Sequence, residues 1–157
     1  MPITTTRLGW APVDTPKSVL LFGEGTLFES LYVIANGSDE LLVIDPKTKE
    51  ADGSMTIVKR IAVGHSPFGL AQATTFDRQP LVAVGSTLDN SLTLINTLTL
   101  RVVETVKLPG SPARLEGSGS WFLITLHDQG TLFSRSTKPN NETYQLGINA
   151  GPFDIAV

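Results

Sequence analysis

The sequence of 157 residues predicts an all-β fold, a partial β-propeller of about three four-stranded antiparallel blades plus flanking strands. A proline in a short polar turn recurs at Pro16, Pro67, Pro112 and Pro152, with separations of 51, 45 and 40 residues. Blades of a propeller repeat at roughly 40–50 residues. The segments between the turns alternate with period two, and none carries the apolar stripe of a capped amphipathic helix. A β-sandwich is the alternative, but it gives no reason for the turn to recur.

Each predicted unit contains the same succession of strands. The units span residues 13–63, 64–108 and 109–148. An inner strand follows the proline, two apolar strands flank a short polar turn, and a more polar strand ends the unit. Inner strands are packed on both faces and read as apolar runs, whereas outer strands meet water. We therefore expect the polar segments "RVVETV" and "NETYQL" to be the outermost strands.

Two flanking strands are predicted outside these units, at residues 3–10 and 152–157. The first has the character of an outer strand, and the second that of one innermost strand. Propellers typically have 4–8 blades, so three blades leave the ring open and expose strand edges. Two explanations stay open, a piece of a longer propeller and a ring that copies of the chain complete together. Either way, we expect self-association or a need for the missing blades.

Composition excludes several classes of function. The formal net charge is −3, and the 12 basic residues form no basic tract, so a nucleic-acid partner has no electrostatic support. No apolar run is long enough to insert into a membrane. The absence of cysteine removes disulfides, zinc-thiolate sites and cysteine nucleophiles. The N-terminal segment lacks the apolar region of a signal peptide, which leaves the compartment undetermined.

Candidate ligand-binding residues follow from the direction of the strands. Strands run alternately up and down, so the turn before each inner strand and the turn between the second and third strands share one face. The residues predicted to bind a ligand there are Lys17, His65, Phe68, Arg114, His127 and Asp154. Lys17 and Arg114 would attract an anionic ligand, with solvated surface charge as the alternative. Phe68 has the alternative role of a packing residue over the core.

The chemistry of these residues predicts neither a metal nor a cofactor. Two histidines on one face raise a metal hypothesis, but two ligands are too few for a typical zinc site unless Asp128 or Asp154 joins them. The sequence has no G-x-S-x-G elbow, no phosphate-binding glycine loop and no H-E-x-x-H motif. Its aspartate-containing turns lack the calcium-loop pattern. We therefore predict no catalytic residue.

The repeat resembles the YVTN family of β-propeller repeats, which includes seven-bladed lactonase-like proteins. The resemblance rests on "YVIAN" at 32–36, "LVID" at 42–45, "VGHSPFGLA" at 63–71 and "SLTLINTLTLRVVE" at 91–104. It covers about residues 13–157, although the third unit matches in pattern rather than in letters. The resemblance implies a propeller fold and suggests an exported or cell-surface location. Because no catalytic constellation stands on the repeat, we predict a non-catalytic binding or scaffold segment. A lactonase-like hydrolase, with metal or histidine assistance, is the alternative function that the resemblance implies.

Overall fold

The computed structural model describes residues 16–23, 29–75 and 77–148. These residues form twelve strands in three four-stranded antiparallel sheets and contain no helix, which confirms the predicted fold class. The flanking strands predicted at 3–10 and 152–157 lie outside the described residues. Within the described part of the chain there is accordingly no helix of the length and apolarity that a membrane span requires.

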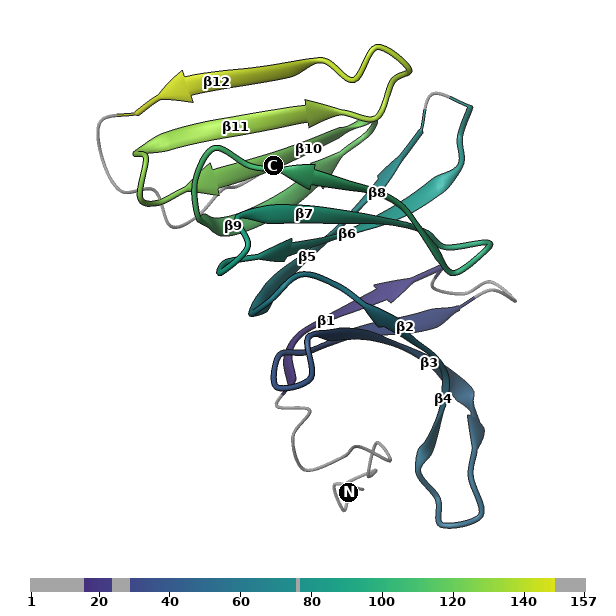
Figure 1. Ribbon diagram of the computed structural model, residues 1–157. Coiled ribbons are helices and arrows are strands. Elements are labelled where there is room, and N and C mark those ends of the chain that lie inside the picture. The colour runs from purple at the N-terminus through teal and green to yellow at the C-terminus, as the bar shows by residue number, and fades with distance from the viewer. Residues whose placement is uncertain (1–15, 24–28, 76, 149–157) are drawn as a thin grey trace, which may run out of the picture.

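Each sheet, or blade, is built from four strands that pair in chain order. Blade 1 contains β1 (Pro16–Phe22), β2 (Ser30–Ala35), β3 (Glu40–Lys49) and β4 (Met55–Ala62). Blade 2 contains β5 (Pro67–Thr74), β6 (Pro80–Ser86), β7 (Ser91–Asn96) and β8 (Arg101–Lys107). Blade 3 contains β9 (Pro112–Ser118), β10 (Trp121–Leu126), β11 (Thr131–Ser136) and β12 (Thr143–Gly147). The blades stack in chain order, with blade 2 in the middle (Figure 1).

The first strands of the blades are the inner strands, and β5 contacts both β1 and β9. Glycine allows the close approach of β5 and β9, since a Cβ on Gly117 would overlap the carbonyl oxygen of Gln72. At the end of β5 the Thr74 N–H donates to the Gly119 carbonyl at 2.9 Å, and the Thr137 hydroxyl donates to the Thr74 carbonyl at 2.6 Å. The polar strands β8 and β12 are outermost, as their sequences predicted.

The core lies between the blades. Successive residues of a strand point to opposite faces, so each blade can bury one set of side chains against the blade before it and another against the blade after it. The cluster between blades 1 and 2 includes Tyr32, Ile34, Leu41, Val43, Val82, Val84 and Ile95. The cluster between blades 2 and 3 includes Leu81, Ala83, Leu92, Leu94, Leu115, Phe122, Ile124 and Phe133. Each large apolar side chain buried in this way contributes roughly 1.5–3 kcal/mol.

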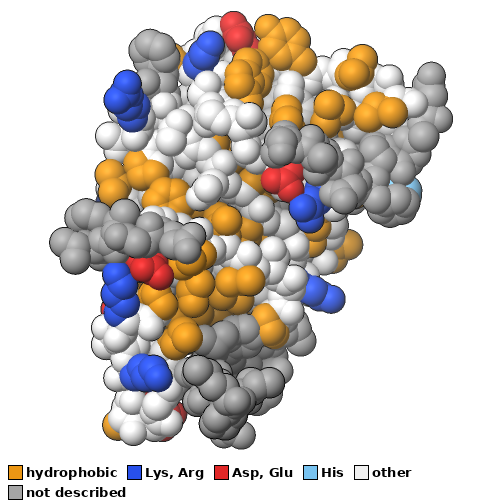
Figure 2. Space-filling model, turned by 180° about the vertical axis from the view of Figure 1, so that it is seen from behind, with side chains coloured by type: hydrophobic (Ala, Val, Ile, Leu, Met, Phe, Trp, Pro, Cys, Tyr) orange, Lys and Arg blue, Asp and Glu red, His pale blue; other side chains and the backbone are white. Residues whose placement is uncertain are grey.

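The two outer blades also carry apolar side chains on their far faces. In blade 1 a third buried cluster contains Val33, Ala35, Leu42 and Ile44. In blade 3 the far face carries Trp121, Leu123 and Leu132, which are half-buried, and Tyr144 and Leu146, which are 61% and 64% exposed. Seen from behind, hydrophobic side chains reach the surface in several separate patches (Figure 2).

Candidate ligand-binding site

Aspartate side chains hold together the face that carries the predicted site. Each of the three turns between second and third strands has an aspartate whose carboxylate accepts a backbone N–H from a turn that leads into an inner strand. The bonds run from Ser66 to Asp39 at 2.8 Å, from His65 to Asp89 at 2.8 Å and from Ser111 to Asp128 at 2.7 Å. Bonds to a carboxylate are stronger than neutral ones, so these contacts fix the turns relative to one another.

His65 lies between two of these aspartates. Its Nδ1 is 3.0 Å from the Asp89 carboxylate, its Nε2 is 4.0 Å from Asp39 Oδ2, and the side chain is 70% exposed. The hydrogen bond to Asp89, followed by the charges of Asp89 and Asp39, raises the pKa of His65. The backbone N–H and the imidazole of His65 in turn lower the pKa of Asp89. The arrangement favours an imidazolium paired with carboxylates.

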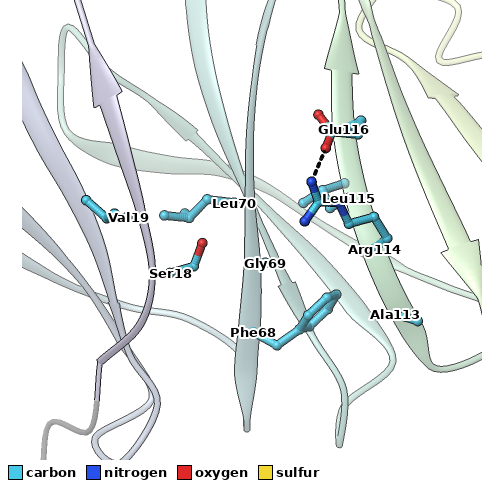
Figure 3. Close-up of a pocket in the computed structure, with 9 residues that line it drawn as sticks. All are labelled: Ser18, Val19, Phe68, Gly69, Leu70, Ala113, Arg114, Leu115 and Glu116. Carbon is cyan, nitrogen blue, oxygen red and sulfur yellow. Dashed lines mark hydrogen bonds and ion pairs between the residues drawn. The ribbon is translucent and has the colours of Figure 1, made fainter. Parts of the chain in front are cut away.

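A hollow of about 250 Å³ lies along the three inner strands. Figure 3 shows Val19, Leu70 and Leu115 along it, with Phe68 at one end and Arg114 and Glu116 on β9. Arg114 stands two residues after its turn proline, as do Ser18 on β1 and Gly69 on β5, which also line the hollow. The repeat therefore places corresponding positions of three blades around one space, which we call the inner groove.

Two contacts shape the inner groove. Phe68 needs the glycine at position 85, since a Cβ there would come within 2.9 Å of the Phe68 ring. Arg114 Nη2 is 2.7 Å from Glu116 Oε1, with side chains that are 50% and 26% exposed. Residues two apart on a strand share a face, which explains why this pair forms. The groove thus offers a cation, an anion and the apolar side chains of Val19 and Phe68.

The structure brings only some of the predicted residues together. Phe68 and Arg114 line the inner groove, whereas Lys17 is an exposed residue of β1 beside the groove residue Ser18. His65 lies in the turn between blades 1 and 2, and His127 is an exposed residue in the turn between β10 and β11. Asp154 lies outside the described residues. Across the part of the chain that the structure describes, no three His, Cys, Asp or Glu side chains gather as metal ligands.

Sequence reasoning missed Glu116, Ser18 and the turn-fixing role of the aspartates. Ser18 could have been found, because it holds the same place after the proline as Arg114. The aspartates were harder to recognise, because they stand at different places within turns of equal length. A shared role without a shared spacing leaves no periodic signal in the sequence.

Comparison with known proteins supports the fold and leaves the family undetermined. No protein-family model and no curated protein matches the chain. Among solved structures, Sqt1 from Saccharomyces cerevisiae has a TM-score of 0.70 at 18% identity over 88% of this chain. A structure of BBS1N in complex with ARL6DN has a TM-score of 0.66 at 17% identity over 88% of the chain. Virginiamycin B lyase from Staphylococcus aureus has a TM-score of 0.61 at 15% identity over 86%.

These neighbours are β-propeller proteins. The chain therefore has the fold of part of a β-propeller. It spans 36%, 41% and 42% of the three matched chains, which is less than half of each. At identities this low the similarity concerns the fold, and the propeller fold carries many functions.

Proposed function

We propose that the chain is a non-catalytic binding segment of a YVTN-type β-propeller, with the inner groove as its ligand site. The observation that carries the proposal is the placement of Phe68, Arg114 and Glu116 on adjacent inner strands, around one hollow. Sites on strands are positioned more rigidly than sites on loops. The turns at the neighbouring face are fixed by carboxylate bonds, which adds to this rigidity.

The groove chemistry favours a ligand that joins an anionic group to an apolar one. The Arg114 guanidinium can exchange Glu116 for a ligand carboxylate, while Val19 and Phe68 receive the apolar part. A suitable probe is N-acetyl-leucine, with the uncharged N-acetyl-leucinamide as its control. Arg114→Met should remove binding of the acid. Glu116→Gln should strengthen it, because the ligand no longer competes with an internal carboxylate.

The test is a titration of the isotope-labelled chain followed by amide chemical shifts. The expected result is a set of saturating shifts at residues 68–70 and 114–116 with the acid and none with the amide. Arg101→Met, at an exposed arginine of β8, is the matched control and should bind like the wild type. Equal shifts with acid and amide, or shifts that survive Arg114→Met, would contradict the groove as the site.

We also propose that a further blade packs on the far face of blade 3. The turn between second and third strands has the same length in blades 2 and 3, so their positions correspond. In blade 2 the positions Leu81, Ala83, Leu92 and Val106 pack in the core against blade 3. Their counterparts in blade 3 are Trp121, Leu123, Leu132 and Leu146. These side chains therefore stand where a propeller buries one blade against the next.

A lactonase-like hydrolase is the second candidate function. The observation in its favour is the contact of His65 with Asp89, since a carboxylate that orients an exposed histidine can assist a general base. The test is lactone hydrolysis with and without a chelator, in the wild type, His65→Ala and His127→Ala. The binding proposal predicts no turnover. Turnover that His65→Ala abolishes, or chelator-sensitive turnover that His127→Ala abolishes, would replace the binding proposal with the hydrolase.

A further inference from the structure

A second cleft, separate from the inner groove, lies between blade 1 and the outer half of blade 2. It has a volume of about 380 Å³ and is bordered by the end of β4 and by β7 and β8. Its polar residues are Asp89, Ser91, Thr93, Thr105 and Lys107, and its apolar ones include Val63 and Val102. Ser91, Thr93 and Ile95 alternate along one face of β7, and Ile95 packs in the core between blades 1 and 2. The hydroxyls thus lie on a face that the repeat uses for blade packing.

The repeat shows that these hydroxyls are peculiar to blade 2. At the end of the second strand and the start of the third, blade 2 has Ser86, Ser91 and Thr93. The corresponding residues are Leu126, Thr131 and Phe133 in blade 3, and Ala35, Glu40 and Leu42 in blade 1. Leu126 and Phe133 fill the core between blades 2 and 3. The smaller polar residues of blade 2 leave room for the turn at Gly64 and for the cleft beside it.

Two of these hydroxyls have no partner. Ser86 Oγ and Ser91 Oγ are buried and make no hydrogen bond in the structure, although their residues are 0% and 5% exposed. A Cβ on Gly64 would come within 2.6 Å of Ser91 Oγ and 2.9 Å of Ser86 Oγ, so only a glycine fits in the turn above them. Buried hydroxyls without a partner are costly, and these two make the packing beneath the cleft polar.

We propose that this cleft binds a small neutral polyol of the monosaccharide class. Hydroxyl groups both donate and accept, so the hydroxyls of Thr93 and Thr105 match the hydroxyls of such a ligand. Val63 and Val102 provide apolar contact for the C–H groups of a sugar. The Lys107 ammonium donates to the Asp89 carbonyl at the rim. Asp89 and Lys107, which both line the cleft, carry opposite charges, so their sum favours a neutral ligand.

The experiment is a titration of the isotope-labelled chain with glucose, galactose and mannose, with glycerol and inorganic phosphate as comparison probes. At least one sugar should shift the amides of residues 62–64, 91–93 and 105–107. Thr93→Val and Thr105→Val keep the side-chain shape. Each should weaken binding of that sugar by about three- to ten-fold, the effect of one lost hydrogen bond. Thr105 is exposed, so Thr105→Val tests the site without disturbing the core.

The matched control is Thr125→Val in blade 3, where another buried hydroxyl lacks a partner away from the cleft. It should bind the sugar like the wild type. Three results would overturn the proposal: no shift with any sugar, so that a buried water accounts for the hydroxyls; shifts with phosphate alone, so that the site is for oxyanions; or sugar shifts that both valine variants leave unchanged. None of these results bears on N-acetyl-leucine binding in the inner groove.

Discussion

At the scale of single residues, Gly117 sets the distance between two blades. A methyl group there would meet the Gln72 carbonyl on β5, and a backbone group has no alternative rotamer. We predict that Gly117→Ala lowers the free energy of unfolding by about 1–3 kcal/mol, the usual range for overpacking a tight contact. Denaturant unfolding measures it.

Gly147→Ala, in the exposed strand β12, is the control for this change. Nothing lies within 4 Å of a Cβ at that position. The substitution should leave stability unchanged or raise it by a few tenths of a kcal/mol, because alanine loses less chain entropy than glycine. If both alanine variants unfold alike, the close packing of β5 and β9 does not hold in solution.

His65 makes the turn face sensitive to pH. Its folded pKa is raised by Asp89 and Asp39, above the value near 6.5 of an unfolded chain. The stabilisation is therefore complete below the unfolded pKa and is lost as the pH rises through the folded pKa. We predict that the wild type loses melting temperature relative to His65→Gln between pH 5.5 and pH 8.5. An imidazole titration by NMR with a midpoint at or below 6.5 would contradict the contact with the carboxylates.

The residue scale also shows how far the sequence predicts the candidate site. Phe68 and Arg114 were predicted because they follow a repeated proline, and a repeated turn allows equivalent positions to be recognised in the sequence. Glu116 was missed because its role depends on a partner two residues earlier on the same face of β9. Ser86 and Ser91 were missed because the lack of a hydrogen-bond partner can be seen only when the neighbouring turn is in place.

At the scale of elements, the strands were predictable and the contacts between blades were not. Alternation marks each strand, and the outermost position of β8 and β12 follows from their polarity. Arg135 on β11 shows the limit. Its neighbours in sequence suggest a polar edge, yet the side chain is only 9% exposed and its Nη2 lies 2.6 Å from Glu104 Oε1 on β8. Glu104 belongs to another blade, and no local sequence pattern predicts this contact.

The ion pair between Arg135 and Glu104 should stabilise the packing of blade 3 on blade 2. Removing the carboxylate leaves a buried guanidinium with weaker partners. Because Glu104 is 40% exposed, the resulting loss of folding stability is moderate. We predict that Glu104→Gln costs about 1 kcal/mol of unfolding free energy. Glu50→Gln, at an exposed glutamate in blade 1, is the matched control and should cost nothing measurable. A double-mutant cycle with Arg135→Met that gives no coupling energy would show that the pair does not stabilise the packing of the two blades.

At the scale of the whole molecule, the repeat predicts the arc of blades and also its open end. The period of the turn proline gave the blade architecture, because each blade must present two packing faces at a fixed interval. What completes the ring could not be predicted, since a face is specified by its own side chains and its partner lies elsewhere. The exposed Tyr144 and Leu146 lie on the far face of blade 3, where we propose that a further blade packs.

Sedimentation velocity of the chain over a hundredfold range of concentration tests this central claim most directly. A bare blade face costs roughly 25 cal/mol per Å² of apolar area left in water, so we predict association that increases with concentration. Leu146→Asp on that face should shift the chain toward monomer. Leu88→Asp, at a 79% exposed leucine in a turn, should not. A compact monomer that sediments alike at every concentration and melts cooperatively would contradict the account, because it would show a closed fold with no blade face left to cover.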